Sequence, residues 1–459
     1  MDAIAALVEN VIRTGPRDLP AEAFDGASRS ILDAFATTIA GSTAPGVAPL
    51  LNVLEEWGGR EEATVALFGT QLPAYHAVLA NVLMCHALEI DDSHYPAIVH
   101  PTAPTLWAAL ATAEQLGGAS GEDFVCAVAL GIDTMARIAL SAPATLDNGY
   151  HTAIYSGFGA AVTAAKLLRC DAKTLHDALG ITFASASASV QAGSDGALVK
   201  RMQPAMNAAN GLKAVRFACA GITGIRNILE GQFGIGRLFN HAPLEKAPLL
   251  DGLGKYFLSS ELTTKRYPTS RCAHAPIEGT LALVRENDIV PDEVNEVRVA
   301  VQESCHKRES KPFDPDEGTP QVKAQFSIDY CVAAAVLWRD VFIREMQDEC
   351  ILDPRVLALA RRVKVVLNPE KGRTQYLPVT VEIRTKRGVF ANNVTRLKGS
   401  PQDPLAWDEI VTERLERCVP YGAVKLPMAA LESLIKQCRD LRSVKDVRSL
   451  LNCLVARKT

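Results

Sequence analysis

Residues 89–104, EIDDSHYPAIVHPTAP, concentrate ionisable side chains between two segments that are otherwise apolar. Asp91, Asp92, Ser93, His94 and His100 lie within ten residues of one another. Carboxylates and imidazoles at this density can transfer protons, and a polar surface loop is the competing interpretation. We predict that this segment belongs to a functional site.

Four further polar clusters interrupt segments with an apolar helical pattern, and several of them lie at predicted helix starts. They contain Tyr150 and His151; Lys200 and Arg201; Lys265, Arg266, Arg271 and His274; and Gln325 and Ser327. The free N–H groups and the dipole of a helix start favour bound anions. Histidines, lysines and arginines without a phosphate loop suit a site that binds a polycarboxylate. Such a site removes a proton beside a carboxylate and needs cations where negative charge develops.

The elements that must position these clusters are helical over residues 20–235. Residues 72–90 are apolar nearly all round, which is typical of a buried helix. Residues 120–140 begin with Ser120 as a cap and with acidic residues in the first turn. Many Ala, Gly and Ser residues allow these helices to approach one another closely. We predict a large all-helical domain over residues 1–262.

The pattern changes after about residue 260, where four segments alternate with period two and are rich in β-branched residues. These predicted strands are residues 295–304, 361–369, 378–388 and 389–396. Helical patterns at 274–287 and 324–338 lie between them, so residues 263–399 read as a smaller α+β domain. Residues 400–459 return to helical periodicity and are expected to pack back on the bundle. The predicted fold class is mainly α, an all-helical domain plus an α+β lid domain.

Composition excludes several functional classes. The 459 residues carry a net charge of -4, which gives no reason to expect a nucleic-acid partner. Eleven cysteines without any CxxC spacing predict neither a zinc nor an iron–sulfur framework and favour a reducing compartment. Neither a basic, apolar leader nor an uninterrupted apolar run of about 18 residues occurs, so we expect a cytoplasmic protein without a membrane span.

Five stretches, in this order, resemble the MmgE/PrpD family. They are HALEIDDSHYPAIVHPTAPTLWAALA, GYHTAIYSGFGAAVTAAKLL, LVKRMQPAMNAANGLKAVRFACAGITG, LEGQFGIGRLF and KRYPTSRCAHAPIEG. That family includes 2-methylcitrate dehydratase, cis-aconitate decarboxylase and iminodisuccinate epimerase. The resemblance implies a helical domain plus an α+β lid domain, a site between them, a homodimer, and neither a metal nor an organic cofactor.

The resemblance also transfers residues one by one. The family histidine before a proline matches His100, the histidine after an aromatic residue matches His151, and two family lysines match Lys200 and Lys265. The family's Asp-Phe-Asp-Asp-Thr motif reads Glu-Ile-Asp-Asp-Ser at 89–93, with a longer first acid. Decarboxylase-like members carry a further histidine where this chain has Ser270, a departure that argues against decarboxylation.

The predicted catalytic residues are Asp91, His100, His151, Lys200 and Tyr150. The predicted substrate-binding residues are Ser93, Lys265, Arg266, Arg271 and His274. A metal site built from Asp91, His94 and His100 is possible by ligand type, but its spacing is not compact, so no metal is expected.

The leading functional prediction is a cofactor-independent lyase that eliminates water from a hydroxy-polycarboxylate of the 2-methylcitrate type. One of His100, His151 or Lys200 would remove the proton alpha to a carboxylate. The first alternative is an epimerase of a dicarboxylate, in which Tyr150 and Lys200 act as two bases. Decarboxylation comes third, and a carboxylate-binding scaffold without activity is the non-enzymatic alternative. The expected partner is a small di- or tricarboxylate.

Overall fold

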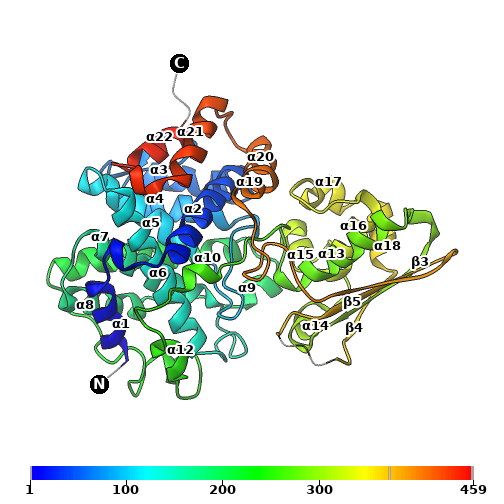
Figure 1. Cartoon of the computed structure of the whole chain (residues 1–459), viewed down its shortest axis with the longest axis horizontal. Coiled ribbons are helices and arrows are strands. Elements are labelled where there is room, and N and C mark those ends of the chain that lie inside the picture. Colours follow the sequence, from blue (N-terminus) through cyan, green and yellow to red (C-terminus); the bar gives the residue numbers. More distant parts are fainter. Residues whose placement is uncertain (1–2, 371, 373, 456–459) are drawn as a thin grey trace.

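The computed structural model describes residues 3–370, 372 and 374–455. Helices make up 57% of the chain and strands 9%, so the predicted mainly α class is confirmed. A body of helices forms one side of the molecule, and a sheet covered by helices forms the other (Figure 1). Each part has its own cluster of buried apolar side chains. The boundaries of the two predicted domains stay a prediction.

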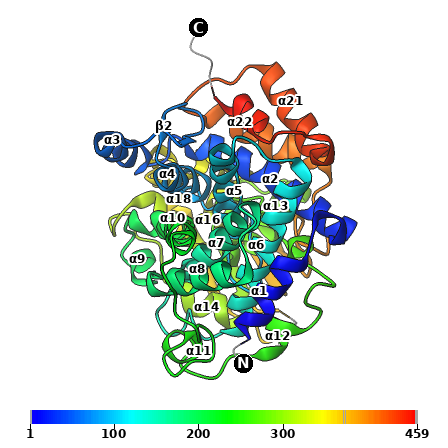
Figure 2. The same ribbon diagram turned by 90° about the vertical axis from the view of Figure 1, so that its left-hand side faces the viewer.

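The first cluster lies among the N-terminal helices, with α5, α6 and α7 near the middle of the view in Figure 2. These helices are α1 (Ile4–Arg13), α2 (Ala21–Gly41), α3 (Val47–Trp57), α4 (Ala74–His86), α5 (Thr102–Leu116), α6 (Gly121–Ser141), α7 (Ser156–Leu167), α8 (Ala172–Ala184), α9 (Gln191–Ser194), α10 (Val199–Cys219), α11 (Ile235–Leu238) and α12 (Lys246–Leu250). A short hairpin that the sequence patterns did not predict, β1 (Ala63–Thr64) and β2 (Gln71–Leu72), precedes α4.

Small residues bring α7 and α10 into close contact, as expected. A Cβ atom added to Gly211 of α10 would overlap the carbonyl oxygen of Gly157 in α7. Glycine is therefore required for this approach, because any larger side chain would push the helices apart. The contact fixes the position of α10, whose first turn carries Lys200.

Helix α6 is the one described helix that is long and apolar enough to cross a membrane. Of that apolar stretch, 94% is buried inside the molecule, so packing in the core accounts for its hydrophobicity. Its N-terminus confirms the predicted cap, because the Ser120 hydroxyl accepts the N–H of Asp123 at 3.2 Å.

The second cluster lies beneath a four-stranded sheet in the order β4-β3-β5-β6. The strands are β3 (Val294–Val301), β4 (Val363–Leu367), β5 (Val379–Thr385) and β6 (Gly388–Val394), which confirms the four predicted strands. Strand β3 pairs parallel with β4 and antiparallel with β5. Helix α13 (Arg271–Glu286) contacts β5 and β6, and α16 (Ile328–Trp338) contacts β4. The other helices here are α14 (Glu303–Glu309), α15 (Pro320–Gln325), α17 (Asp348–Ile351) and α18 (Pro354–Ala360).

The C-terminal segment returns to the helical side of the molecule (Figure 1). It contains α19 (Trp407–Ile410), α20 (Glu416–Cys418), α21 (Met428–Arg439) and α22 (Arg448–Leu454). Its buried apolar side chains belong to the first cluster, and α21 contacts α2. The chain thus leaves the bundle before α13 and comes back to it after β6.

Candidate active site

The loop between α4 and α5 carries most of the ionisable cluster. It begins after His86, the last residue of α4, and two of its residues have left-handed backbone: Glu89 with φ 55° and Ile98 with φ 55°. For side chains other than glycine such conformations are strained, and they gather at functional sites. The loop is held from outside, because Thr152 donates its hydroxyl to the carbonyl of Ile98.

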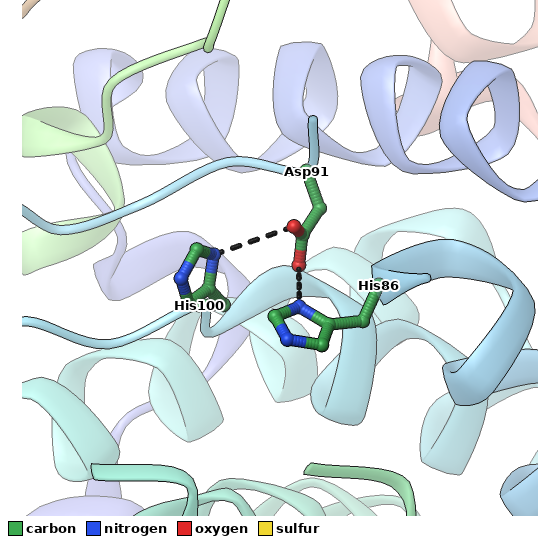
Figure 3. Close-up of side chains that lie close together, drawn as sticks. All are labelled: His86, Asp91 and His100. Carbon is green, nitrogen blue, oxygen red and sulfur yellow. Dashed lines mark hydrogen bonds and ion pairs between the residues drawn. The ribbon is translucent and has the colours of Figure 1, made fainter. Parts of the chain in front are cut away.

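The side chains of His86 and His100 both meet the carboxyl group of Asp91. The Nδ1 atom of His86 lies 2.9 Å from Asp91 Oδ2, and the Nδ1 atom of His100 lies 3.4 Å from Asp91 Oδ1. Figure 3 shows both rings directed at this carboxyl group, and the two ring centroids are 4.8 Å apart. Burial opposes ionisation of Asp91, but the two histidines hold its pKa well below the usual value. Asp91 is therefore a carboxylate that orients two imidazoles.

His100 is the reachable member of this group. Its side chain is 18% exposed, against 1% for Asp91 and 0% for His86. The carbonyl oxygen of Asp92 lies 2.9 Å from His100 Nδ1 and can only accept, so this nitrogen carries the hydrogen. Nε2 then holds the free lone pair. Burial lowers the pKa of His100 to about 4, so the ring is neutral near pH 7 and can take up a proton.

Glu89 joins this trio to two lysines. Its Oε1 atom lies 3.1 Å from His86 Nε2 and forms an ion pair with Lys200, while Oε2 lies 3.5 Å from Lys265 Nζ. Lys265 also donates to the backbone carbonyl of Glu89 at 3.0 Å. All four of these side chains are at most 3% exposed. One carboxylate from the loop therefore holds two ammonium groups that come from distant parts of the chain.

The two lysines differ in their acidity. Burial, and then the positive charges of Lys265 and Arg201, lower the pKa of Lys200 well below its usual value, while the ion pair with Glu89 opposes that effect. Burial lowers the pKa of Lys265 to about 8, although the carboxylate of Asp91 favours its charged form. Lys265 therefore carries a proton at pH 7 that it can release more easily than an ordinary lysine.

Two further carboxyl groups, Asp92 in the loop and Asp33 in α2, bond to partners other than the two histidines. Asp92 accepts the Thr102 hydroxyl at 2.6 Å, and burial raises its pKa well above the usual value. Asp33 accepts Arg414 Nε at 2.6 Å, and the same guanidinium donates to the carbonyl of Ile90 at 2.7 Å. Arg414, from the C-terminal segment, thus supports the backbone next to Asp91.

His151 lies near the trio, and Tyr150 does not join it through any contact in the described residues. The rings of His86 and His100 add to the burial that lowers the pKa of His151 to about 3. Its Nδ1 accepts the N–H of Ala153 at 3.1 Å, so Nε2 carries the hydrogen. Tyr150 instead packs on Phe239, with ring centroids 4.8 Å apart. Its predicted catalytic role stays a prediction.

Ser93 and His94 support the loop itself. Ser93 pairs with Thr263 through two backbone hydrogen bonds, and its hydroxyl donates to the Val99 carbonyl at 3.1 Å. His94 Nδ1 accepts the N–H of Ala97 at 3.2 Å, while Nε2 lies 3.7 Å from Glu261. The Ser93 pairing joins the loop to the segment that leads to Lys265. The substrate-binding role of Ser93 stays a prediction.

The basic segment divides between different partners. Arg266 pairs with Glu413 at 2.8 Å and with Glu278 at 3.4 Å. Arg271 donates to the Tyr95 carbonyl at 2.6 Å and to the Tyr376 hydroxyl. Both guanidinium groups are thus held by protein partners, whereas Lys265 points at Glu89. Their predicted roles in binding substrate are untested.

His274 is 3% exposed, and its ring meets Tyr267 with centroids 5.3 Å apart. Burial, and then the charge of Lys265, lower its pKa well below the usual value, so the ring is neutral. Its Nε2 is buried without a hydrogen-bond partner among the described residues. This nitrogen is available to a bound molecule, which is compatible with the predicted substrate-binding role.

His86, Asp91 and His100 also offer three ligand atoms within 4.8 Å of one another, a set that metal ions such as Zn²⁺ accept. The structure uses these atoms differently. Nδ1 of His100 carries a hydrogen toward the Asp92 carbonyl, and Lys200 Nζ lies 3.4 Å from His86 Nε2. With its hydrogen on Nδ1, His100 could offer only Nε2 to a metal, and the ammonium group beside His86 repels a cation. The geometry therefore favours proton transfer.

The sequence interpretation missed three residues of this cluster: His86, Glu89 and Arg414. His86 stands in an almost uniformly apolar helix, where a histidine is unusual, and that was the available signal. Glu89 was seen as part of the acidic motif but was not assigned a role. For Arg414, in an amphipathic helical stretch far from the loop, the sequence contains no comparable signal.

A helical body lies beside an α+β unit, and the candidate site is a buried network of carboxylates, imidazoles and ammonium groups, which are groups that can transfer protons. The family comparison agrees. The MmgE/PrpD N-terminal domain matches residues 4–246 and the MmgE/PrpD C-terminal domain matches residues 267–418. The chain belongs to the MmgE/PrpD family and is an enzyme.

Curated relatives extend over the same length. Cis-aconitate decarboxylase of Aspergillus terreus is 26% identical over 467 residues, covering 95% of this chain and 93% of the relative. Human cis-aconitate decarboxylase is 22% identical over 396 residues, covering 84% of this chain and 80% of the relative.

Proposed function

We propose that this enzyme is a lyase that removes a proton alpha to a carboxylate of a di- or tricarboxylate and eliminates water from its hydroxyl-bearing carbon. The observation that carries this proposal is the buried network in which Asp91 and Glu89 hold His86, His100, Lys200 and Lys265 together. It contains a base and cations within one cluster, which elimination beside a carboxylate requires.

His100 is the proposed base. It is neutral near pH 7, it is partly exposed, and its Nε2 is free, while Asp91 and the Asp92 carbonyl keep Nδ1 protonated. The carbon–hydrogen bond breaks as Nε2 takes the proton, and its electrons are held on the carboxylate, where nearby cations offset the charge. These electrons then form the carbon–carbon double bond as the C–O bond to the neighbouring hydroxyl breaks, and the protonated hydroxyl leaves as water. Lys265, with a pKa of about 8, is protonated at pH 7 and is the proposed donor to the departing hydroxyl.

Charge balance favours an anionic ligand. Lys200, Arg201 and Lys265 are buried, and the carboxylates of Glu89 and Asp91 oppose them. Among the described residues no carboxylate pairs with Arg201, whose partners are amide and carbonyl oxygens. The excess of positive charge in a site of low dielectric attracts a substrate carboxylate.

Decarboxylation is the second candidate, because the relatives described above are named cis-aconitate decarboxylase. Ser270 favours dehydration instead. It stands where decarboxylase-like members carry a histidine, and its hydroxyl caps α13 by accepting the N–H of Cys272 at 3.2 Å. A capping hydroxyl with no basic nitrogen cannot replace a histidine in proton transfer.

The test is incubation of the enzyme in deuterated water with 2-methylcitrate, citrate, cis-aconitate and a chiral dicarboxylate, followed by NMR. Loss of the hydroxy acid with a new alkene signal supports dehydration. Release of carbon dioxide from cis-aconitate, with deuterium in the product, supports decarboxylation. Deuterium at a stereocentre of a dicarboxylate without any alkene would support an epimerase. A protein that exchanges nothing in this panel contradicts the proposal.

We also propose a homodimer, which the family resemblance implies, and a cytoplasmic location, which agrees with cysteines that lack a disulfide-type pattern. Light scattering coupled to size-exclusion chromatography tests the oligomeric state, since a mass near that of one chain would contradict it.

A further inference from the structure

Gln325, the last residue of α15, contacts all three segments that build the candidate site. Its side-chain Nε2 donates to the carbonyl of Leu88 at 2.8 Å, and its Oε1 accepts Arg201 at 3.2 Å. Its backbone carbonyl accepts the N–H of Ser270 at 2.8 Å. The residue is 1% exposed, so no solvent competes for these bonds. Leu88 precedes Glu89, Arg201 follows Lys200, and Ser270 lies five residues after Lys265.

The bond to Leu88 acts on the strained point of the loop. The Leu88 carbonyl belongs to the peptide that enters Glu89, whose φ of 55° is left-handed. Lys265 holds the next peptide by donating to the Glu89 carbonyl at 3.0 Å. A left-handed glutamate persists only where surrounding bonds hold both of its peptides. Gln325 therefore keeps the conformation that directs the Glu89 carboxylate toward Lys200.

Gln321 offers a natural comparison one turn earlier on α15. It also accepts Arg201, at 2.7 Å, and it is 3% exposed. Its Nε2 donates instead to the carbonyl of Met346, a residue outside the acid–base cluster, at 2.7 Å. Both glutamines thus hold the same guanidinium inside the protein, and only Gln325 also holds the loop.

We propose that Gln325 is a positioning residue that sets the distance between the Glu89 loop, the Lys200 helix and the Lys265 segment. This inference rests on the proposed function, since it assigns Gln325 to the same site. The proposal assigns a function to α15, a helix that carries no reacting group. This helix sets the positions of the base and of the two lysines relative to one another. A displacement of about 1 Å in such a site costs on the order of a hundred-fold in rate.

The kinetic test compares Gln325→Leu with Gln321→Leu, using 2-methylcitrate and cis-aconitate as probes. Both variants lose one contact to Arg201 and one to a carbonyl, so their melting temperatures should fall by similar amounts. We expect kcat of Gln325→Leu to fall by roughly ten- to a hundred-fold, with KM changed by less than about three-fold. Gln321→Leu should keep a kcat near that of the unmodified enzyme. Equal losses of kcat in both variants would overturn the proposal.

A second measurement does not depend on turnover. The chain has nine histidines, so their ring ¹³C–¹H signals can be resolved in protein labelled at histidine, with His86→Gln assigning His86. His86 lies against Glu89, so its signal should move in Gln325→Leu and stay in place in Gln321→Leu. An unmoved His86 signal in Gln325→Leu overturns the proposal, whatever the activity.

The two failures are distinguishable. If the unmodified enzyme turns over neither probe, the proposed function fails while the histidine signals still decide the role of Gln325. If Gln325→Leu does not fold, Gln325→Asn replaces it, because the shorter amide keeps its polarity and cannot span the distance to both partners. Gln325→Asn should then give the same loss of kcat and the same shift of His86, and full activity in that variant contradicts the proposal.

Discussion

The acidic loop at 89–100 and the basic segment at 265–274 are both predicted from the sequence to hold site residues, but their side chains are arranged differently in the structure. Asp91 and His100 of the loop converge on one point with His86, the last residue of α4. Asp91 and His86 are at most 1% exposed, and His100 is 18% exposed. In the basic segment, adjacent residues diverge, since Lys265 reaches Glu89 while Arg266 reaches Glu413 and Glu278. A cluster of charges in sequence therefore becomes a site only where its side chains share a partner.

Exposure shows the same difference. Lys265 is 1% exposed and Arg266 is 28% exposed. A half-buried guanidinium with two carboxylate partners holds the surface of the fold together, and such pairs contribute about 0–1 kcal/mol. Lys265, in contrast, is a fully buried ammonium group. Removing either it or its carboxylate partner would leave an unpaired charge inside the protein, which is strongly destabilising.

The largest expected effect is at His100. His100→Asn should lower kcat by roughly a thousand-fold, because it removes the nitrogen that we assign as the base. Steady-state kinetics with the compound that shows turnover measures it. His94→Asn is the matched control in the same loop, since the ring of His94 accepts the N–H of Ala97 and lies near Glu261 instead of Asp91. If both substitutions are equally harmful, the loop acts as a scaffold and His100 is not the base.

A second substitution pair separates the two neighbours in the basic segment. Lys265→Met should lower kcat by on the order of a hundred-fold, because a buried cation at the developing charge is lost. Arg266→Met should change kcat by less than about three-fold, because the Arg266 guanidinium is held by Glu413 and Glu278 and not by Glu89. Parallel kinetics on the two variants decides the comparison. A greater loss in Arg266→Met would mean that the substrate binds on the other side of this segment.

The pH dependence of kcat/KM should follow the ionisation of one group from each region, His100 of the loop and Lys265 of the basic segment. His100 must be unprotonated, so activity rises as pH increases through about 4. Lys265 must be protonated, so activity falls as pH increases through about 8. Each limb should change about ten-fold per pH unit beyond its midpoint. Lys265→Arg should lower activity at every pH, because arginine keeps its proton and is a poor donor, and the remaining activity should lack the alkaline limb. An unchanged alkaline limb would assign it to another group.

The smallest effect on activity is expected at Arg271. Arg271→Met should lower the free energy of unfolding by about 1–3 kcal/mol, because the Tyr95 carbonyl and the Tyr376 hydroxyl lose a buried partner. Its kcat should remain close to that of the unmodified enzyme. Urea unfolding measures the first quantity and kinetics the second. A specific rise in KM without loss of stability would show that Arg271 binds substrate after all.

Some of the site could be predicted because local patterns carry it. His100 before Pro101, Lys200 at a helix start and the acidic run at 91–92 stand out among apolar residues, and the structure places all of them in or behind one cluster. Tyr150 also stood out, yet packs on Phe239. A polar residue within an apolar segment is therefore either buried for structural reasons or functional, and the sequence does not distinguish the two.

The sequence by itself determined the periodic elements: the four strands, the capped helix after Ser120 and an apolar helix predicted over residues 72–90. The structure ends that helix earlier, at His86, where the loop of the candidate site begins. The periodic elements depend on residues only a few positions apart, so they can be read locally. Tertiary structure alone decided which charges meet. Glu89 finds Lys265, and Gln325 finds Leu88, across 176 and 237 residues of chain. Such partners depend on how α10, α13 and α15 pack against the loop, because a buried charge is stable only where the assembled fold supplies its counterpart.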